Sequence, residues 1–348
     1  MTTATVAPRA PQPARLRGSR SRTVVLAVGL VVSLGVLVLM AGLGVAVGSK
    51  AVPLGDVWRA LVSPDDSYNA AVVASRIPRT QVGVLVGAAL AVAGAVIQGL
   101  TRNPLGDPGL LGVNAGASMS VVLVTAFLGA GLGRTVWAAI PGAVLAAVVV
   151  YVVGSGRAGS TPVRLILAGA AVSAVLVAVV DAVSLAKPDV FDSYRFWAIG
   201  SLAGRTAQTV SLTTGFVVVG LVICLAMSRS LNAIELGDQA ATSLGLAPGR
   251  TKALAALGAT ILCAAAVAAA GPIGFVGLAV PHVVRSFTGA DHRWLLPYCA
   301  VLGPVLLIGS DVIGRVVARP GELMVGAVTA FVGAPFLVAA VRRGRVGL

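Results

Sequence analysis

The chain has 348 residues, of which 57% are hydrophobic and 11% are charged, and its formal net charge is +14. Soluble domains carry about 25% charged residues, so this composition excludes an ordinary soluble fold and places the chain in a lipid bilayer. A soluble protein this basic would suggest nucleic-acid binding. In a membrane protein the positive-inside rule explains the arginines better, and no nucleic-acid partner is expected.

The N-terminus combines a basic stretch with a long apolar run. Five arginines lie within the first 22 residues, namely Arg9, Arg15, Arg17, Arg20 and Arg22. No charged residue follows from Thr23 to Ser49. The apolar core of a signal peptide is shorter, about 7–15 residues. We therefore expect a basic, disordered cytoplasmic tail over residues 1–22 and a single transmembrane domain over residues 23–348, which opens with a retained first helix.

Uncharged runs long enough for membrane segments recur along the chain. They cover residues 23–49, 80–101, 108–133, 135–156, 165–180, 206–228, 253–284, 294–310 and 323–341. Because a spanning helix needs about 20 residues, the run 253–284 is expected to form a full helix, a break and a half-helix. The sequence thus predicts an all-α, polytopic integral membrane protein with about ten transmembrane helices. If both termini are placed in the cytoplasm, more lysines and arginines fall on the cytoplasmic side than on the outer side. The positive-inside rule therefore predicts this orientation.

Two stretches of the chain look alike, residues 91–117 and 266–290. Each contains a small-residue helix end, a Gly/Pro break and a short segment ending in Gly-Ala, and the two run in opposite directions in the expected topology. This is the pattern of an inverted repeat with broken helices near a transport path, although convergent composition would look the same. The break residues predicted to lie near that path are Asn103, Pro104, Pro108, Gly271, Pro272, Gly274, Gly277 and Pro281.

The sequence lacks the motifs of several chemical functions. It has no G-x-x-x-x-G-K-[ST] loop and no C-x-x-C, and His282 and His292 are expected to be structural or interfacial rather than metal ligands. Asp181 and Asp311 are the nearest candidates for an intramembrane proton relay. Arg315 lies one helical turn after Asp311, which favours a structural ion pair. No catalytic residue, metal or cofactor is expected.

The stretch SRSLNAIELGDQAATSLGLAPGR, residues 228–250, lies between two apolar runs on the expected inner side. Leu236, Ala240 and Leu244 recur at four-residue spacing, which predicts a short amphipathic helix that ends near Gly245. Its acidic polar face argues against anionic lipid and favours docking in a groove of a soluble partner. The predicted contact residues are Glu235, Leu236, Gly237, Asp238, Leu244 and Gly245.

Six ordered blocks resemble the FecCD-type permeases of ABC importers, which move iron–siderophore, haem or cobalamin complexes across bacterial inner membranes. The first block is RIPRTQVGVLVGAALAVAGAVIQGLTRNPLGDPGLLGVNAGAS, residues 76–118. The later ones are WAIGSLAG (197–204), ELGDQAATSLG (235–245), GPIGFVGLAVPHVVR (271–285), ADHRWLLP (290–297) and GELMVGAVTAFVGAPF (321–336). One departure is Met324, where the family commonly has proline.

The resemblance implies a ten-helix transport subunit, not an enzyme, that pairs with a second permease, identical or paralogous. It implies two cytoplasmic ATP-binding subunits beneath residues 235–245, which consume the ATP, and an extracytoplasmic substrate-binding protein above. The expected cargo is an iron(III)–siderophore complex. The sequence leaves haem and cobalamin open as cargo, and an ion-coupled secondary transporter and a structural membrane scaffold remain rivals from other classes.

The resemblance also implies that Arg76, Arg79 and Arg315 face the binding protein and pair with its glutamates. A guanidinium is always charged and holds a carboxylate with two parallel hydrogen bonds, so it suits that task. The alternative is that Arg76 and Arg79 anchor a helix end by snorkelling. If the docking role is right, charge reversal of Arg76 and Arg79 is expected to leave the protein folded while weakening capture of the loaded binding protein.

Overall fold

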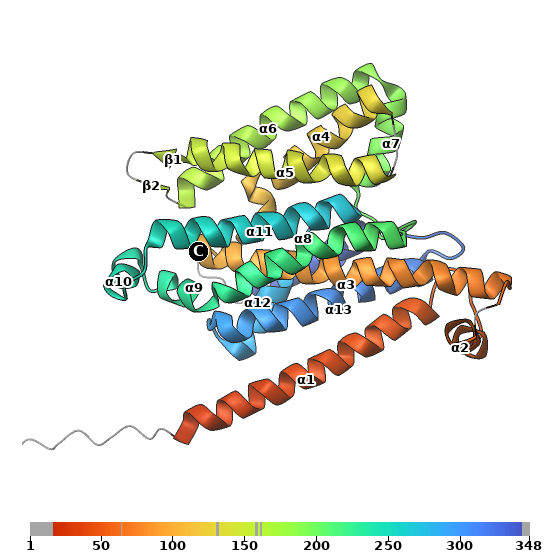
Figure 1. Cartoon of the computed structure of the whole chain (residues 1–348), viewed down its shortest axis with the longest axis horizontal. Helices are drawn as coiled ribbons and strands as arrows, with labels where there is room; N and C mark the ends of the chain where they lie inside the picture. Colours follow the sequence, from red (N-terminus) through yellow and green to blue (C-terminus); the bar gives the residue numbers. More distant parts are fainter. Residues whose placement is uncertain (1–16, 64, 130–131, 157–158, 161, 343–348) are drawn as a thin grey trace, which may run out of the picture.

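The computed structural model describes residues 17–63, 65–129, 132–156, 159–160 and 162–342, and the fold is almost entirely helical (Figure 1). A two-residue antiparallel ladder between β1 (Ser155–Gly156) and β2 (Gly159–Ser160) is the only strand pairing within those ranges. The helices are α1 (Arg17–Ala46), α2 (Leu54–Val62), α3 (Tyr68–Thr101), η1 (Pro108–Leu111), α4 (Val113–Leu128), α5 (Leu132–Gly154), α6 (Pro162–Ala186), α7 (Pro188–Ala198), α8 (Ala207–Ala226), α9 (Ser228–Glu235), α10 (Asp238–Ser243), α11 (Pro248–Ala270), α12 (Val276–Thr288), α13 (His292–Val317) and α14 (Val325–Arg342).

The membrane segments lie where the uncharged runs predict them. Within the described ranges, seven helices are long and apolar enough to cross a bilayer, namely α1, α3, α5, α6, α8, α11 and α13. The apolar helices α4 and α14 are shorter, and α12 is a 13-residue half-helix split from α11. These ten segments confirm the polytopic all-α fold. Figure 1 shows α9, α10 and the β ladder at one end of the bundle and α2 and α7 at the other.

The first helix begins earlier than predicted and lies at the edge of the bundle. α1 starts at Arg17, so residues 17–22, predicted to belong to the tail, are helical; residues 1–16 lie outside the described part. Most of its apolar side chains are exposed, as suits a helix that faces lipid. At the end near α9, the Tyr298 hydroxyl donates to the Leu26 carbonyl at 2.7 Å, and Arg22 donates to the Thr288 carbonyl at 2.9 Å.

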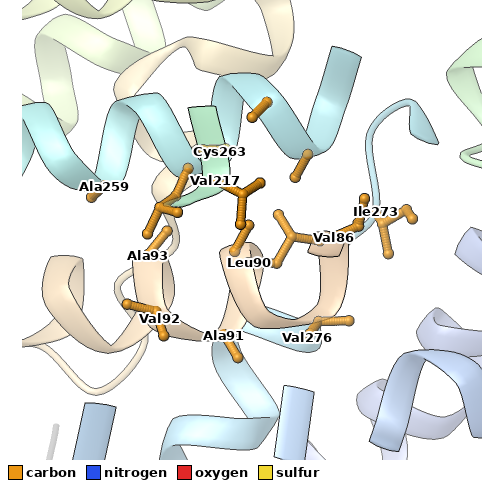
Figure 2. Packing of buried hydrophobic residues seen from close by; sticks show 14 of the residues in the cluster. Val86, Leu90, Ala91, Val92, Ala93, Val217, Ala259, Cys263, Ile273 and Val276 are labelled. Atoms are coloured by element: carbon orange, nitrogen blue, oxygen red, sulfur yellow. The ribbon is translucent and has the colours of Figure 1, made fainter. Parts of the chain in front are cut away.

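The central helix of the bundle is α3, with α11, α13, α12 and α8 packed around it. Figure 2 shows Val86, Leu90 and Ala93 of α3 gathered with Val217 of α8 and Cys263 of α11, all of them buried. Small residues allow these helices to approach closely. The backbone of α12 packs directly on Gly94 of α3, where an added Cβ would collide with the Gly277 carbonyl.

The two predicted breaks exist, and they lie at opposite ends of the bundle. The first follows α3 at Arg102 (φ 50°) and contacts α9, whereas the second separates α11 from α12 and contacts the residues after α7. Two of the predicted break residues, Gly277 and Pro281, lie inside α12 instead. The residues within or at the edge of the breaks are Asn103, Pro104, Pro108, Gly271, Pro272 and Gly274. Their opposite placement agrees with an inverted repeat, which stays a prediction.

Candidate functional site

Arg76 and Arg79 lie inside α3 rather than at its start. The hydroxyl of Ser67 accepts a hydrogen bond from the Ala70 N–H at 3.2 Å and caps the helix, so α3 begins at Tyr68 and continues through Pro78. The uncharged-run criterion placed the start of this segment at residue 80, because it treats every charge as a helix boundary. Both arginines are therefore fixed on the wall of the central helix, at the end of the bundle that carries α2 and α7.

Arg76 and Arg315 hold the end of α1. Together their guanidinium groups donate five hydrogen bonds to main-chain carbonyls between residues 44 and 50, over distances of 2.6–3.2 Å. The last turn of a helix leaves carbonyls without intrahelical partners, and cations stabilise that end of the helix dipole. Arg76 is only 6% exposed and Arg315 only 1%. Neither side chain is open to a partner protein in this arrangement.

Arg79 is the centre of a group of neighbouring charged residues that we call the outer cluster: Arg76, Arg79, Asp311, Arg315 and Glu322. Its Nη2 lies 2.7 Å from Oδ1 of Asp311, and its Nη1 lies 2.7 Å from Oε2 of Glu322. Arg315 also binds Asp311, at 2.9 Å, which confirms the predicted pair one turn apart. Two arginines thus share two carboxylates, whereas Arg76 beside them binds only main-chain carbonyls, so the cluster keeps an excess positive charge.

Glu322 is the exposed edge of the outer cluster. Its side chain is 30% exposed, compared with 11% for Arg79. Burial alone would raise the pKa of Glu322, but hydrogen bonds from Arg79 and Ser49 outweigh it and hold that pKa below its usual value, so the carboxylate stays charged. Of the three predicted docking arginines, Arg79 is the one that a partner carboxylate could reach, by displacing Glu322.

These contacts change the expected result of charge reversal. A glutamate in place of Arg76 would face main-chain carbonyls in a buried site and leave them without donors, so the fold would not survive intact. The docking role of Arg76, Arg79 and Arg315 stays a prediction, since the structure contains one chain.

At the other end of the bundle, the stretch from residue 228 to 250, which was predicted to contain one amphipathic helix, forms the two short helices α9 and α10. Gly237 separates α9 from α10. Its φ is 115°, a backbone conformation that residues other than glycine rarely adopt. Leu236 and Leu244 flank α10 and are 73% and 65% exposed. Gly245 follows with φ 80° and ends α10 as predicted. The predicted short helix therefore exists as α10, but it begins after Gly237 and leaves Leu236 and Leu244 exposed on either side of it.

Asp238 ties α10 to the rest of the bundle. Its carboxylate lies 2.6 Å from Nζ of Lys252 in α11 and 2.9 Å from Nη2 of Arg102 after α3. The hydrogen bond from Lys252, with help from Arg102, lowers the pKa of Asp238. Arg102 also donates to the Ile234 carbonyl at 2.7 Å, which joins α9 to the same point. Part of the predicted acidic docking face is thus occupied within the chain.

Asn232 fastens α9 to the start of α13, and we call this contact the α9–α13 latch. Its amide oxygen accepts the His292 main-chain N–H at 2.8 Å and lies 3.0 Å from that ring's Nδ1, while its nitrogen donates to Asp291 at 2.7 Å. His292 is fully buried, and its Nε2 lies 3.8 Å from the Glu235 carboxylate, whose pKa is raised by burial. The predicted structural role of His292 fits this position.

Gln98 links the central helix to the half-helix, a contact that the sequence did not reveal. Its nitrogen donates to the Gly277 carbonyl at 3.1 Å, and its oxygen accepts from Arg285 at 2.5 Å. The one available signal was a polar amide in an otherwise apolar run, but nothing in the sequence names its partners. Among the residues that the structure describes, no group of three His, Cys, Asp or Glu side chains is placed to hold a metal ion.

Known proteins resemble this chain over most of its length. Residues 34–343 match the FecCD transport family. The chain is 44% identical over 310 residues to the ferric enterobactin transport system permease protein FepD of Escherichia coli, covering 88% of this chain and 92% of that protein. It is 39% identical over 330 residues to the Fe(3+)-citrate import system permease protein YfmD of Bacillus subtilis, covering 94% and 97%.

A solved structure agrees with these relatives. An inward-facing metal-chelate type ABC transporter has a chain that superposes with a TM-score of 0.79 at 26% identity, over 91% of this chain and 98% of that one. The fold, the family match and the close relatives all point the same way. This multi-pass membrane protein therefore belongs to the FecCD transport family.

Proposed function

We propose that this chain is the permease subunit of an ABC importer that carries an iron(III)–siderophore complex across the bacterial inner membrane. The supporting observation is its similarity to permeases named for ferric enterobactin, Fe(3+)-citrate and iron(3+)-hydroxamate, at 44%, 39% and 38% identity over 88–94% of the chain. Relatives named for cobalamin and hemin are 38% and 37% identical over 76% and 78% of it. Haem and cobalamin are therefore the alternative cargoes.

The proposed assembly contains a second permease, two cytoplasmic ATP-binding subunits and an extracytoplasmic binding protein. The ATP-binding subunits dock on α9 and α10, whose exposed leucines suit a groove on a soluble protein. The binding protein docks at the opposite end, over the outer cluster. Both termini are then cytoplasmic, and ATP is consumed by the partner rather than by this chain, which needs no cofactor of its own.

The proposed mechanism follows from how α9 and α10 are attached. When the ATP-binding subunits close, they displace α10. The Asp238 ion pairs carry this motion to α3 and α11, and the α9–α13 latch carries it to α13. Gln98 and Arg285 extend the connection to α12. The segment after α3 and the segments on either side of α12 then act as hinges. The path between two permease subunits then opens to one side at a time.

The test of this function is uptake by proteoliposomes that contain the permease, its ATP-binding partner and the loaded binding protein. We expect uptake of a ferric siderophore that requires ATP and survives a protonophore, with haemin and cobalamin measured as competing cargoes. The permease alone should transport nothing. Uptake by the permease alone that collapses with the protonophore would identify a secondary transporter, and stronger uptake of haemin or cobalamin would reassign the cargo.

Replacing Leu236 and Leu244 with serine tests the inner docking surface. Burying a leucine stabilises an interface by roughly 1.5–3 kcal/mol, so loss of two should weaken binding of the ATP-binding subunits at least about a hundredfold. Calorimetric titration of the purified permease with those subunits measures this. Leu61→Ser in α2 is the matched control, since Leu61 is exposed at the opposite end. Unchanged affinity in the double variant would remove α10 from the docking surface.

Asn232→Ala tests whether the latch transmits force. The substitution leaves the buried His292 N–H without its acceptor, a loss of about 1–3 kcal/mol, while Asp291 keeps its bonds from Arg293 and the exposed leucines stay in place. We expect normal binding of the ATP-binding subunits but about tenfold more ATP hydrolysed per siderophore imported. Ser243→Ala on α10 is the control. An unchanged ratio of ATP to cargo would show that α9 does not act through α13.

The outer cluster predicts opposite effects for two neighbouring substitutions. Arg79→Gln removes the reachable guanidinium and should weaken capture of the binding protein about threefold, whereas Glu322→Gln frees Arg79 and should strengthen it by a similar factor, the scale of a partly exposed ion pair. Surface plasmon resonance at low and high salt measures both, with Arg59→Gln in α2 as control. If Glu322→Gln has no effect or weakens capture, Arg79 is not the docking group.

A further inference from the structure

An apolar groove that neither the docking surfaces nor the latch uses opens between α3, α5, α6 and α11. Its volume is about 220 Å³, and most of its lining is aliphatic, including Leu100, Ala147 and Ala256. The lining residues with polar side-chain atoms are Thr101, Tyr151, Lys252 and Thr260. A hydrated metal chelate would need more polar partners than this, so the groove is not suited to the transported cargo.

The groove begins at helix ends and runs into the bilayer. Along α11 its lining extends from Lys252 to Thr260, a rise of about 12 Å at 1.5 Å per residue. The hydrocarbon core of a bilayer is about 30 Å thick, so this length covers most of one leaflet. Tyr151 lies near the end of α5, where aromatic residues favour the membrane interface. The groove therefore has the depth and direction of an acyl chain in one leaflet.

The mouth of the groove carries positive charge. Lys252 lines the shallow end, and Arg102 follows the lining residue Thr101 directly. Both cations share a single carboxylate, that of Asp238, at 2.6 Å and 2.9 Å, so one positive charge is left over. Basic groups at the cytoplasmic surface of a membrane attract anionic lipid headgroups by about 1 kcal/mol each.

We propose that this groove binds one anionic phospholipid of the inner leaflet, with an acyl chain between α5 and α11 and its phosphate on Lys252. The apolar walls select the chain, and the surplus charge at the mouth selects the headgroup. The proposal rests on the position of the groove in the membrane and not on the identity of the cargo. A lipid in this place contacts the same lysine that anchors α10.

The experiment is native mass spectrometry of the purified permease with phosphatidylglycerol or phosphatidylcholine of identical acyl chains. We expect one tightly retained phosphatidylglycerol, preferred about fivefold over phosphatidylcholine. Lys252→Gln should abolish the preference while leaving weak lipid binding, and Arg250→Gln is its matched control on the same turn. Ala256→Phe fills the groove and should prevent retention, with the exposed Leu254→Phe as its control.

Three results would overturn the proposal. Equal retention of the two lipids by the wild-type protein would show that the mouth does not select charge. Phosphatidylglycerol that stays bound to Ala256→Phe, or to Ala147→Phe in the opposite wall, would place the lipid elsewhere. A change of oligomeric mass in these filling variants would show that a second copy of the chain covers the groove. The lipid-induced rise in melting temperature of Lys252→Gln, compared with wild type, gives the same answer if a filling variant does not fold.

Discussion

The bilayer offers no water to an unpaired backbone group, and this constraint explains where the polar residues of this protein lie. Among the described residues, carbonyls at the end of α1 and within the half-helix α12 receive donors from other parts of the chain. Arg76 and Arg315 supply donors to the carbonyls at the end of α1, and Gln98 supplies one to Gly277 in the half-helix. Substituting these donors leaves main-chain carbonyls without a hydrogen-bond partner. The first role of these side chains is therefore to make an irregular helical bundle stable in lipid.

The central helix connects the two polar regions that this constraint creates. α3 carries Arg76 and Arg79 near one end and Gln98 near the other, and Arg102 follows it directly. Between them the helix is buried and packed through small residues against α11, α12 and α13. A motion applied at α10 thus acts on one end of a continuous helix whose other end lies in the outer cluster. The two proposed docking sites, which lie at opposite ends of the bundle, are joined by this single helix.

The sequence predicted the ten membrane segments and the break after Ala270 because both are local: a run without charge, or glycine and proline in series. The prediction failed where the conformation of a residue depends on a partner that is distant in the sequence. The start of α3 was missed because the uncharged run begins only at residue 80, after Arg76 and Arg79, yet acceptors in α1, α13 and the loop before α14 hold both arginines within the helix. Gly237 lies inside the stretch from Leu236 to Leu244 that was expected to form one helix, although its φ of 115° separates α9 from α10. The partners of Gln98 and Asn232 lie 59 to 187 residues away.

Lys252 connects the anchoring of α10, the apolar groove and the helix α11. Its ammonium binds Asp238, and the residue lines the mouth of the groove and lies in the first turns of α11, which packs on α3. An anionic group in the groove competes with Asp238 for this lysine, so binding of lipid and the anchoring of α10 cannot be independent. By linkage the coupling is reciprocal: any partner that pulls α10 away from α11 frees Lys252 and strengthens lipid binding by the same factor. The groove and the inner docking surface therefore form one coupled system.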